Sequence, residues 1–521
     1  MPFGRKLVAG LSLVLSLSCA ACATEPAPSW SYAPSAQPTP ALAGDAGPAA
    51  DPSSSPTPVG DPPADPLADP LADPLAGTVD PGEANDGVDP TQASLSPNSG
   101  NIQVYPDQPS VLPGQTLRLH TSTSARSYAL TITREGALTQ VLYSHGGYVG
   151  HDYASRLTRA PQPINTVNAN WPVSVSVSTQ GWQPGVYTVY GRDSNGRTGG
   201  GIFVVRSPVA ADPAKAMFVL PVMDYQAYNG WGVANFYATP RSKRAMTVSW
   251  DRPYNVNGGL SFFPKYDRYT LRWLEGHGYP LTYTTDYDLA TNPPATAPRV
   301  MVLGQHTEYV NKALYDYVDT HVNTIGDMSV AYFGANSFYW QVRMSPDPRG
   351  AGRPELMTCY KDRHTDPMYA VDPILTTVKW RMSPVSRPEN RLFGAQYIGI
   401  VSGGHTPRTM TVGDAAPAWA LAGTGWAVGT QLNGLLLGET DAPSGVGPGT
   451  PIMTGSGTYG GRVIYGMSSF WVSPTGARVF DAATFAFGGA LGGRISLGVS
   501  QASFDQYARN IMDWLGLPAA H

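Results

Sequence analysis

Residues 299–318 read RVMVLGQHTEYVNKALYDYV, and this stretch decides the fold that the sequence predicts. The first five residues form an apolar run of the buried-strand type, and residues 309–318 carry apolar side chains at helical spacing. A strand that ends in glycine, here Gly304, and opens into a helix is where α/β sheets place their reactive groups. We therefore expect His306 and Glu308 to face one pocket.

The alternation of strand and helix continues on both sides of this stretch. Strands are predicted at 217–220, 281–285 and 328–333, and helices at 265–275, 307–322 and 504–515. Residues 374–500 are richer in strands and glycine, and we interpret them as β elaborations that return to the sheet. The pattern predicts a three-layer α/β domain over residues 211–521, with a mostly parallel sheet of the glutamine-amidotransferase or flavodoxin-like kind.

Residues 100–210 have an all-β pattern instead. Apolar and polar residues alternate at 116–120, 128–133, 173–177 and 186–190, and turn pairs such as Pro184-Gly185 and Asn195-Gly196 separate these runs. We expect a small β-sandwich domain that precedes the α/β domain.

The first 23 residues have the pattern of a secretion signal. Arg5 and Lys6 precede an apolar stretch at 7–17, which is too short to span a membrane, and small residues follow at 18–23. Two interpretations stay open: plain cleavage after Ala23, or a lipoprotein signal with a lipid on Cys22. The protein is therefore predicted to be exported to the periplasm, the cell surface or the medium, with a lipid tether as one alternative.

Residues 24–99 are rich in Pro, Ala and Asp and include the repeat DPLA at 65–76. Too few large apolar side chains are present to offset the entropy of ordering, so we expect a disordered linker. Beyond this linker Cys359 is the only cysteine, which excludes an internal disulfide in the folded part.

Composition and motifs exclude several classes of function. The net charge is −4, and the basic residues are too scattered for a nucleic-acid surface. The sequence contains no Walker loop, no dinucleotide fingerprint in a strand–helix context, no Gly-x-Ser-x-Gly elbow and no His-Glu-x-x-His motif. Nucleotide, serine-hydrolase and zinc chemistries are therefore disfavoured.

Polar residues at predicted strand ends are the better candidates for chemistry, because such ends converge on one edge of a parallel sheet. These candidates are Tyr228, His306, Glu308, Asn336, Lys361 and Glu439. Each also has a purely structural interpretation. His306 can be a hydrogen-bonded core residue, Glu308 a first-turn carboxylate favoured by the helix dipole, and Asn336 a turn or cap residue.

Taken together and in order, the segments resemble the large (beta) subunit of N,N-dimethylformamidase and its relatives over most of residues 100–500, the β domain included. The matching pieces are GVY (185–187), QAYN (226–229), SWDRPY (249–254), RWLE (272–275), HTEY (306–309), GAN (334–336), YWQVR (339–343), CYKD (359–362), AGTG (422–425), LLGE (436–439) and VFD (479–481). Each piece is weak, but the ordered set is specific.

The resemblance implies a mononuclear Fe(III) site held by Tyr187, Tyr228 and Glu308, at the junction of the two domains. Two phenolates and a carboxylate are hard anionic ligands that suit Fe(III). The implied reaction is hydrolysis of the C–N bond of a small amide, with iron as Lewis acid.

The resemblance also implies roles for the remaining candidates. We assign Asn336 and Lys361 to binding substrate or developing charge, and Glu439 to proton transfer, with His306 as the second candidate for that step.

The sequence departs from the family pattern beside the site. Gln305 stands between Gly304 and the histidine, and Thr307 and Val310 replace the usual Asp and Trp. Dimethylformamide itself is therefore not the expected substrate. The alternative hypothesis is a non-catalytic surface protein, with glycan binding as one form, that retains the fold. A homo-oligomer or a small partner subunit is suggested only by the resemblance.

Overall fold

The computed structural model describes residues 102–238, 244–254, 259–350, 352–401, 406–443, 447–459 and 461–519. The predicted signal peptide (1–23) and linker (24–99) lie outside these residues.

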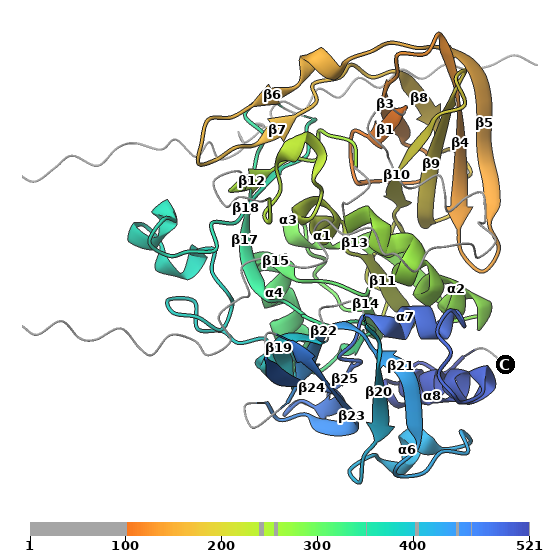
Figure 1. Ribbon diagram of the computed structural model, residues 1–521, viewed down its shortest axis with the longest axis vertical. Coiled ribbons are helices and arrows are strands. Elements are labelled where there is room, and N and C mark those ends of the chain that lie inside the picture. The colour runs from red at the N-terminus through yellow and green to blue at the C-terminus, as the bar shows by residue number, and fades with distance from the viewer. Residues whose placement is uncertain are drawn as a thin grey trace, which may run out of the picture. The chain divides into compact units, whose positions relative to one another are not determined.

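Two sheets that share one core form the first part of the described chain (Figure 1). The smaller sheet has the order β1-β3-β8, with β1 (Gln103–Pro106), β3 (Thr116–Ser122) and β8 (Val175–Ser178). The larger has the order β2-β10-β9-β4-β5, with β2 (Ser110–Val111), β10 (Thr198–Val205), β9 (Gly185–Asp193), β4 (Ser127–Glu135) and β5 (Gln140–Val149). A short antiparallel pair, β6 (Thr158–Arg159) and β7 (Val167–Asn168), follows β5 and precedes β8 in the chain.

Alternate residues of both sheets fill this sandwich core, for example Leu119 of β3, Leu130 of β4 and Phe203 of β10. Strands therefore form where the sequence alternates, because one face of each strand is buried against the other sheet. The boundary of a separate domain at residue 210 stays a prediction.

The largest sheet in the described chain is mixed and runs in the order β13-β11-β14-β16-β25-β24-β23-β20-β21. Its parallel half consists of β13 (Leu281–Thr285), β11 (Ala216–Leu220), β14 (Val300–Leu303), β16 (Ser329–Tyr332) and β25 (Arg478–Asp481). Its antiparallel half consists of β24 (Arg462–Val472), β23 (Thr450–Tyr459), β20 (Arg408–Val412) and β21 (Gln431–Leu436).

The predicted three-layer α/β fold with a mostly parallel sheet is therefore wrong. Strand accounts for 34% of the structure and helix for 21%, so β structure in mixed and antiparallel sheets predominates. The apolar runs of the parallel half dominate the sequence pattern, but strand pairing depends on long-range register that local patterns do not encode. Thus β25 pairs with β16 although β17 to β24 lie between them in the chain.

Two small sheets complete the strand structure of the described residues. One has the order β12-β18-β17-β15, with β12 (Thr247–Val248), β18 (Leu356–Thr358), β17 (Trp340–Ser345) and β15 (Tyr309–Asn311). The other pairs β19 (Gln396–Val401) with β22 (Gly438–Ala442) in antiparallel fashion.

The strand β15 corrects the predicted helix at 307–322. Residues Tyr309–Asn311 pair in parallel with β17, and α4 (Lys312–Asp319) begins only after them. Asn311 caps this helix, because its side chain accepts a hydrogen bond from the N–H of Leu314. Glu308 therefore precedes a strand, and its interpretation as a first-turn helix carboxylate is wrong.

Helices cover both faces of the parallel half of the large sheet. One core receives side chains from α1 (Val222–Ala227), α2 (Arg268–Gly276), α6 (Ala418–Leu421), α7 (Ala486–Leu491) and α8 (Gln501–Trp514), and the other from α4 and α5 (Asn390–Phe393). The short α3 (Asp286–Thr291) contributes to both. Among the described helices none is long and apolar enough to cross a membrane.

Candidate active site

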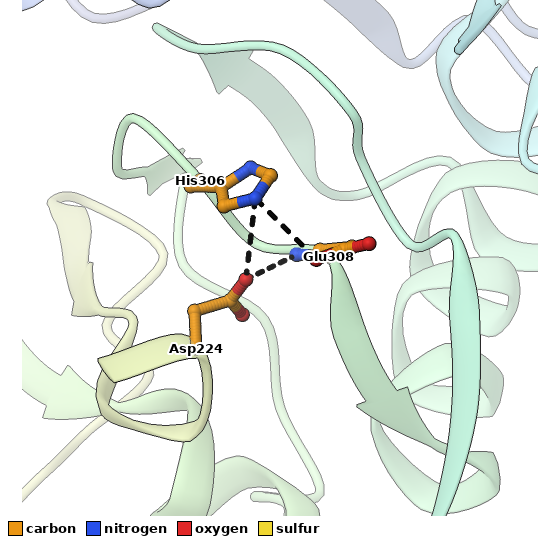
Figure 2. A group of neighbouring side chains, drawn as sticks. All are labelled: Asp224, His306 and Glu308. Atoms are coloured by element: carbon orange, nitrogen blue, oxygen red, sulfur yellow. Dashed lines mark hydrogen bonds and ion pairs between the residues drawn. The ribbon is translucent and has the colours of Figure 1, made fainter. Parts of the chain in front are cut away.

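A buried aspartate of α1 holds the segment that carries His306 and Glu308 (Figure 2). Asp224 accepts hydrogen bonds from the backbone N–H groups of Glu308, at 3.0 Å, and Tyr309, at 3.3 Å. His306 Nε2 lies 3.4 Å from Glu308 Oε2 and 3.9 Å from Asp224 Oδ1. The three buried side chains offer ligand atoms within 4.8 Å of one another, so this group can hold a metal ion.

A second buried aspartate fixes the start of the same loop. Asp267 accepts hydrogen bonds from the backbone N–H of Gln305, at 2.7 Å, and from the hydroxyl of Tyr225, at 2.6 Å. Glycine is required at position 304, because a Cβ on Gly304 would lie 2.4 Å from Asp267 Oδ1. The loop between β14 and β15 is thus held by carboxylates at both ends, which gives its side chains a defined direction.

Two tyrosine hydroxyls converge on the Glu308 carboxylate. Tyr228 follows α1 and donates to Oε2 at 2.7 Å, and Tyr237 lies 2.8 Å from both carboxylate oxygens. The two hydroxyl oxygens are 3.1 Å apart, and the two rings stack with centroids 4.5 Å apart. Two phenol oxygens and a carboxylate in such proximity form a set of hard oxygen donors.

Glu439 of β22 approaches the same histidine. Its Oε2 lies 3.6 Å from His306 Nε2 and accepts a hydrogen bond from Asn336 Nδ2 at 2.6 Å. Asn336 follows β16 with φ of 60°, and its backbone N–H donates to the Asp441 carboxylate at 2.9 Å. Strained left-handed backbone of this kind is concentrated at functional sites. The buried Asn336 Oδ1 has no hydrogen-bond partner among the described residues.

Lys361 supplies a positive charge beside the tyrosines. It follows β18, also has a left-handed backbone, with φ of 59°, and places Nζ 3.5 Å from the ring centroid of Tyr237. The ring of Trp340 lies 4.8 Å from the same nitrogen. These contacts are cation–π interactions, which hold the ammonium group against the site.

The site buries several carboxylates beside few positively charged groups, and this shifts the pKa values of its acids and of its histidine. Burial raises the pKa of Asp224 to about 8 and that of Asp441 to about 7. Burial acts to lower the pKa of His306, but the charge of Glu439 and the hydrogen bond to Glu308 raise it to about 10.

Glu308 behaves differently from the other acids. Burial acts to raise its pKa, but the hydrogen bond and charge of His306, the charge of Lys361 and the hydroxyl of Tyr228 hold it below its usual value. The site therefore keeps an ionised carboxylate at the point where the tyrosine hydroxyls meet.

Tyr187, the third ligand that the resemblance implies, lies elsewhere. Its hydroxyl donates to the backbone carbonyl of Gln183 at 2.7 Å, and its ring stacks on Phe203 in the sandwich core. Side chains alternate along β9, so Tyr187 points into the sandwich while the neighbouring Val186 belongs to the core of the large sheet. The hydrogen bonds and ring contacts of Tyr187 lie within the sandwich, and its role as an iron ligand at the junction of the two predicted domains stays a prediction.

The structure brings together all the other predicted residues, namely Tyr228, His306, Glu308, Asn336, Lys361 and Glu439. Their individual roles in catalysis stay predictions.

Sequence analysis misses Tyr237 and Asp224. Asp224 follows β11 closely, so the strand-end rule that selects His306 could have found it. Tyr237 has no such signal, because it reaches the site only through the fold of the segment after Tyr228.

Comparison with known proteins identifies the family of the chain. A family model described as N,N-dimethylformamidase beta subunit-like, C-terminal, matches residues 133–502. A search of curated proteins finds no match to the chain. The matched region runs from β4 to the start of α8 and contains every residue of the site. The chain therefore belongs to the family of N,N-dimethylformamidase beta subunit-like proteins.

Proposed function

We propose that this protein is an iron-dependent hydrolase that cleaves the C–N bond of a small amide. The observation that carries the proposal is the convergence of the Tyr228 and Tyr237 hydroxyls on Glu308, within reach of His306. Membership of the family supports the same reaction class. The donor set itself favours a hard cation over a zinc-type ligand field.

The ligands proposed for Fe(III) are Tyr228, Tyr237 and Glu308. Their oxygens already lie within 3.1 Å of one another in pairs, and deprotonation of the two phenols would balance the charge of a ferric ion. When bound, iron supplies a Lewis acid that polarises the amide carbonyl. Asp224 keeps its role as acceptor of the Glu308 backbone N–H and so orients this ligand.

Glu439 is the proposed proton carrier. Its Oε2 faces His306 Nε2 at 3.6 Å and is held by Asn336 Nδ2 at 2.6 Å. Glu439 takes a proton from the attacking water as the C–O bond forms, and returns it to the leaving nitrogen as the C–N bond breaks. Because the Ala335 carbonyl can only accept, His306 Nδ1 carries an N–H, and the raised pKa of His306 keeps a second N–H on Nε2 beside this carboxylate.

Asn336 and Lys361 are the proposed substrate-binding groups. The buried Asn336 Oδ1 lacks a partner among the described residues, and a buried acceptor of this kind suits the N–H of an amide. The Lys361 ammonium offers charge to an oxygen that becomes negative during the reaction. Glu308 is 2% exposed and Glu439 5%, so the proposed substrate is small.

Metal analysis combined with visible absorption tests the proposal on the purified full-length protein. We expect about one iron per chain and a tyrosinate-to-iron charge-transfer band, together with amine release from short-chain formamides and acetamides. A protein that stays colourless and iron-free after loading with ferric iron contradicts the iron site. A coloured protein that hydrolyses no small amide contradicts the reaction and favours a binding role.

We also propose, from residues 1–23 alone, that the protein is exported. Mass spectrometry of the mature N-terminus distinguishes cleavage after Ala23 from lipidation at Cys22, and an uncleaved N-terminus contradicts export. The beta-subunit description of the family suggests a second subunit, which co-purification from the native host would detect.

A further inference from the structure

The segment that carries both site tyrosines has a conformation that its own sequence does not favour. Between Tyr228 and Tyr237 lie Gly230 and Gly232, and Gly232 and Val233 adopt φ of 71° and 55°. Glycine gives up much backbone entropy on folding, and a β-branched residue at positive φ is strained. The two hydroxyls nevertheless lie 3.1 Å apart. Two hydrogen bonds within the segment join its ends, from Phe236 N–H to the Ala227 carbonyl and from Asn235 Nδ2 to the Tyr228 carbonyl, and contacts from outside the segment add to them.

Arg252, which is 1% exposed, makes those contacts. Its Nη2 donates to the backbone carbonyl of Gln226 at 2.8 Å, and its Nη1 donates to the backbone carbonyl of Ala234. Its Nε donates to the carbonyl of Ser249, at 3.0 Å, and to Gln226 Oε1, at 3.1 Å. The guanidinium thus connects the end of α1, just before Tyr228, to the backbone just before Tyr237.

The partners of Arg252 are unusual for a buried cation. Among the described residues no carboxylate forms an ion pair with it, and all four of its acceptors are carbonyl oxygens of backbone or amide groups. Burial lowers the pKa of Arg252 to about 9, which reflects the cost of keeping this charge away from water. The four carbonyl acceptors are the groups among the described residues that offset this cost, so the charge of Arg252 holds it to these carbonyls.

We propose that Arg252 is a positioning residue that fixes the distance between Tyr228 and Tyr237 and so pre-forms the site for iron. This inference rests on the proposed function, because it assigns Arg252 to the ligand set named there. The planar guanidinium is suited to the task, since its fork can bind two carbonyls at once in fixed geometry. A lysine binds as a single point, and burial favours its neutral form, so it cannot connect the two backbone positions.

The test compares the variants R252K and R252M with R268K as a matched control. Arg268 is equally buried, but it pairs with Glu135 at 3.2 Å where β4 meets α2, away from the site tyrosines. Two quantities are measured on the full-length protein: amide hydrogen exchange of residues 226–237 in the metal-free state, and affinity for ferric iron with the position of the visible band.

We expect R252K to speed exchange in residues 226–237, to weaken iron binding by about 10- to 100-fold, as for other groups that orient metal ligands, and to shift the visible band. We expect R252M to show faster exchange in residues 226–237 and weaker iron binding than R252K. R268K should lower the unfolding temperature while leaving exchange in this segment and the band unchanged.

The outcomes separate this inference from the function on which it rests. If the wild type binds no iron, the proposed function fails, but faster local exchange in R252K still supports the role of Arg252 in connecting the two ends. If the wild type binds iron and R252K matches R268K in local exchange and iron affinity, the positioning role of Arg252 is overturned.

Discussion

The sandwich core and the site at the strand ends both bury tyrosines, but their hydroxyls have different partners. In the sandwich, Tyr187 donates to the carbonyl of Gln183, and burial raises its pKa to about 12. In the site, Tyr228 and Tyr237 share one carboxylate, Glu308. A hydroxyl that donates to a backbone carbonyl has its hydrogen bond and is held in place. Two hydroxyls that donate to one carboxylate form a cluster of oxygens that can rearrange around a cation. The partner of a buried tyrosine, and not its burial, therefore distinguishes the tyrosines that we propose as ligands.

The change with the largest expected effect removes the shared carboxylate. We expect E308Q to lose the iron and the visible band, and to lower amide hydrolysis by more than about 100-fold, beyond the range for groups that only support ligands. Iron analysis and amine release measure both effects. The control is E275Q, because Glu275 also accepts from a tyrosine hydroxyl, that of Tyr283 at 2.7 Å, but outside the site. Wild-type iron content in E308Q would contradict the role of Glu308 as an iron ligand.

Loss of the proposed proton carrier should affect turnover without affecting the metal. We expect E439Q to lower kcat by about 10²- to 10⁴-fold, the usual contribution of a general acid–base group, while iron content stays at the wild-type level. Steady-state kinetics and the visible band, measured on one preparation, separate the two effects. An unchanged kcat would assign proton transfer to another residue, of which His306 is the nearest.

Asp267, which supports the site, should make stability depend on pH in a defined direction. Burial raises the pKa of Asp267 from 3.8 to about 6, although the Tyr225 hydroxyl and the Gln305 N–H act to lower it. Because the folded state holds this proton more tightly, the contribution of Asp267 to the free energy of unfolding is fully present below about pH 4 and is lost as the pH rises to about 6, by up to about 3 kcal/mol.

D267N should remove this part of the pH dependence, because an amide does not titrate in that range. Urea unfolding at about pH 4, 5 and 6 measures the slope of the free energy of unfolding against pH. The same slope in D267N and the wild type would show that Asp267 does not titrate as its burial implies.

The smallest expected effects compare the two kinds of tyrosine directly. We expect Y237F to weaken iron binding at least about 10-fold and to reduce the visible band, as expected for a group at the metal. Y187F should leave both unchanged and lower the free energy of unfolding by about 1 kcal/mol, the value of one hydrogen bond. If Y187F instead removes the band, the ligand set implied by the resemblance is correct and the present geometry is not that of the loaded site.

Local patterns in the sequence predict many elements of the fold but not their pairing. The apolar run at 299–303 becomes β14, and the alternating runs at 116–120 and 186–190 lie in β3 and β9. The strands of the antiparallel half of the large sheet find their partners through long-range contacts, which no local pattern encodes. The residues at 309–311 have helical spacing but form β15, because pairing with β17 overrides local preference.

The residues of the site also differ in whether a local pattern predicts them. The strand-end rule selects His306, Glu308 and Asn336, because each comes shortly after a strand that the sequence predicts. Tyr237 lies outside any such rule, and Tyr187 is selected only by resemblance. A short motif identifies a residue type but not the face of the strand on which it lies.

The sequence by itself determined the local alternation of the strands, the loop with His306 and Glu308, and the resemblance to the family. The tertiary structure decided that the large sheet is mixed, and that Tyr237 rather than Tyr187 joins Tyr228 at the carboxylate. The physical reason is that backbone patterns act over a few residues, whereas the site depends on contacts between distant segments. The guanidinium of Arg252, which connects Gln226 to Ala234, is one such contact.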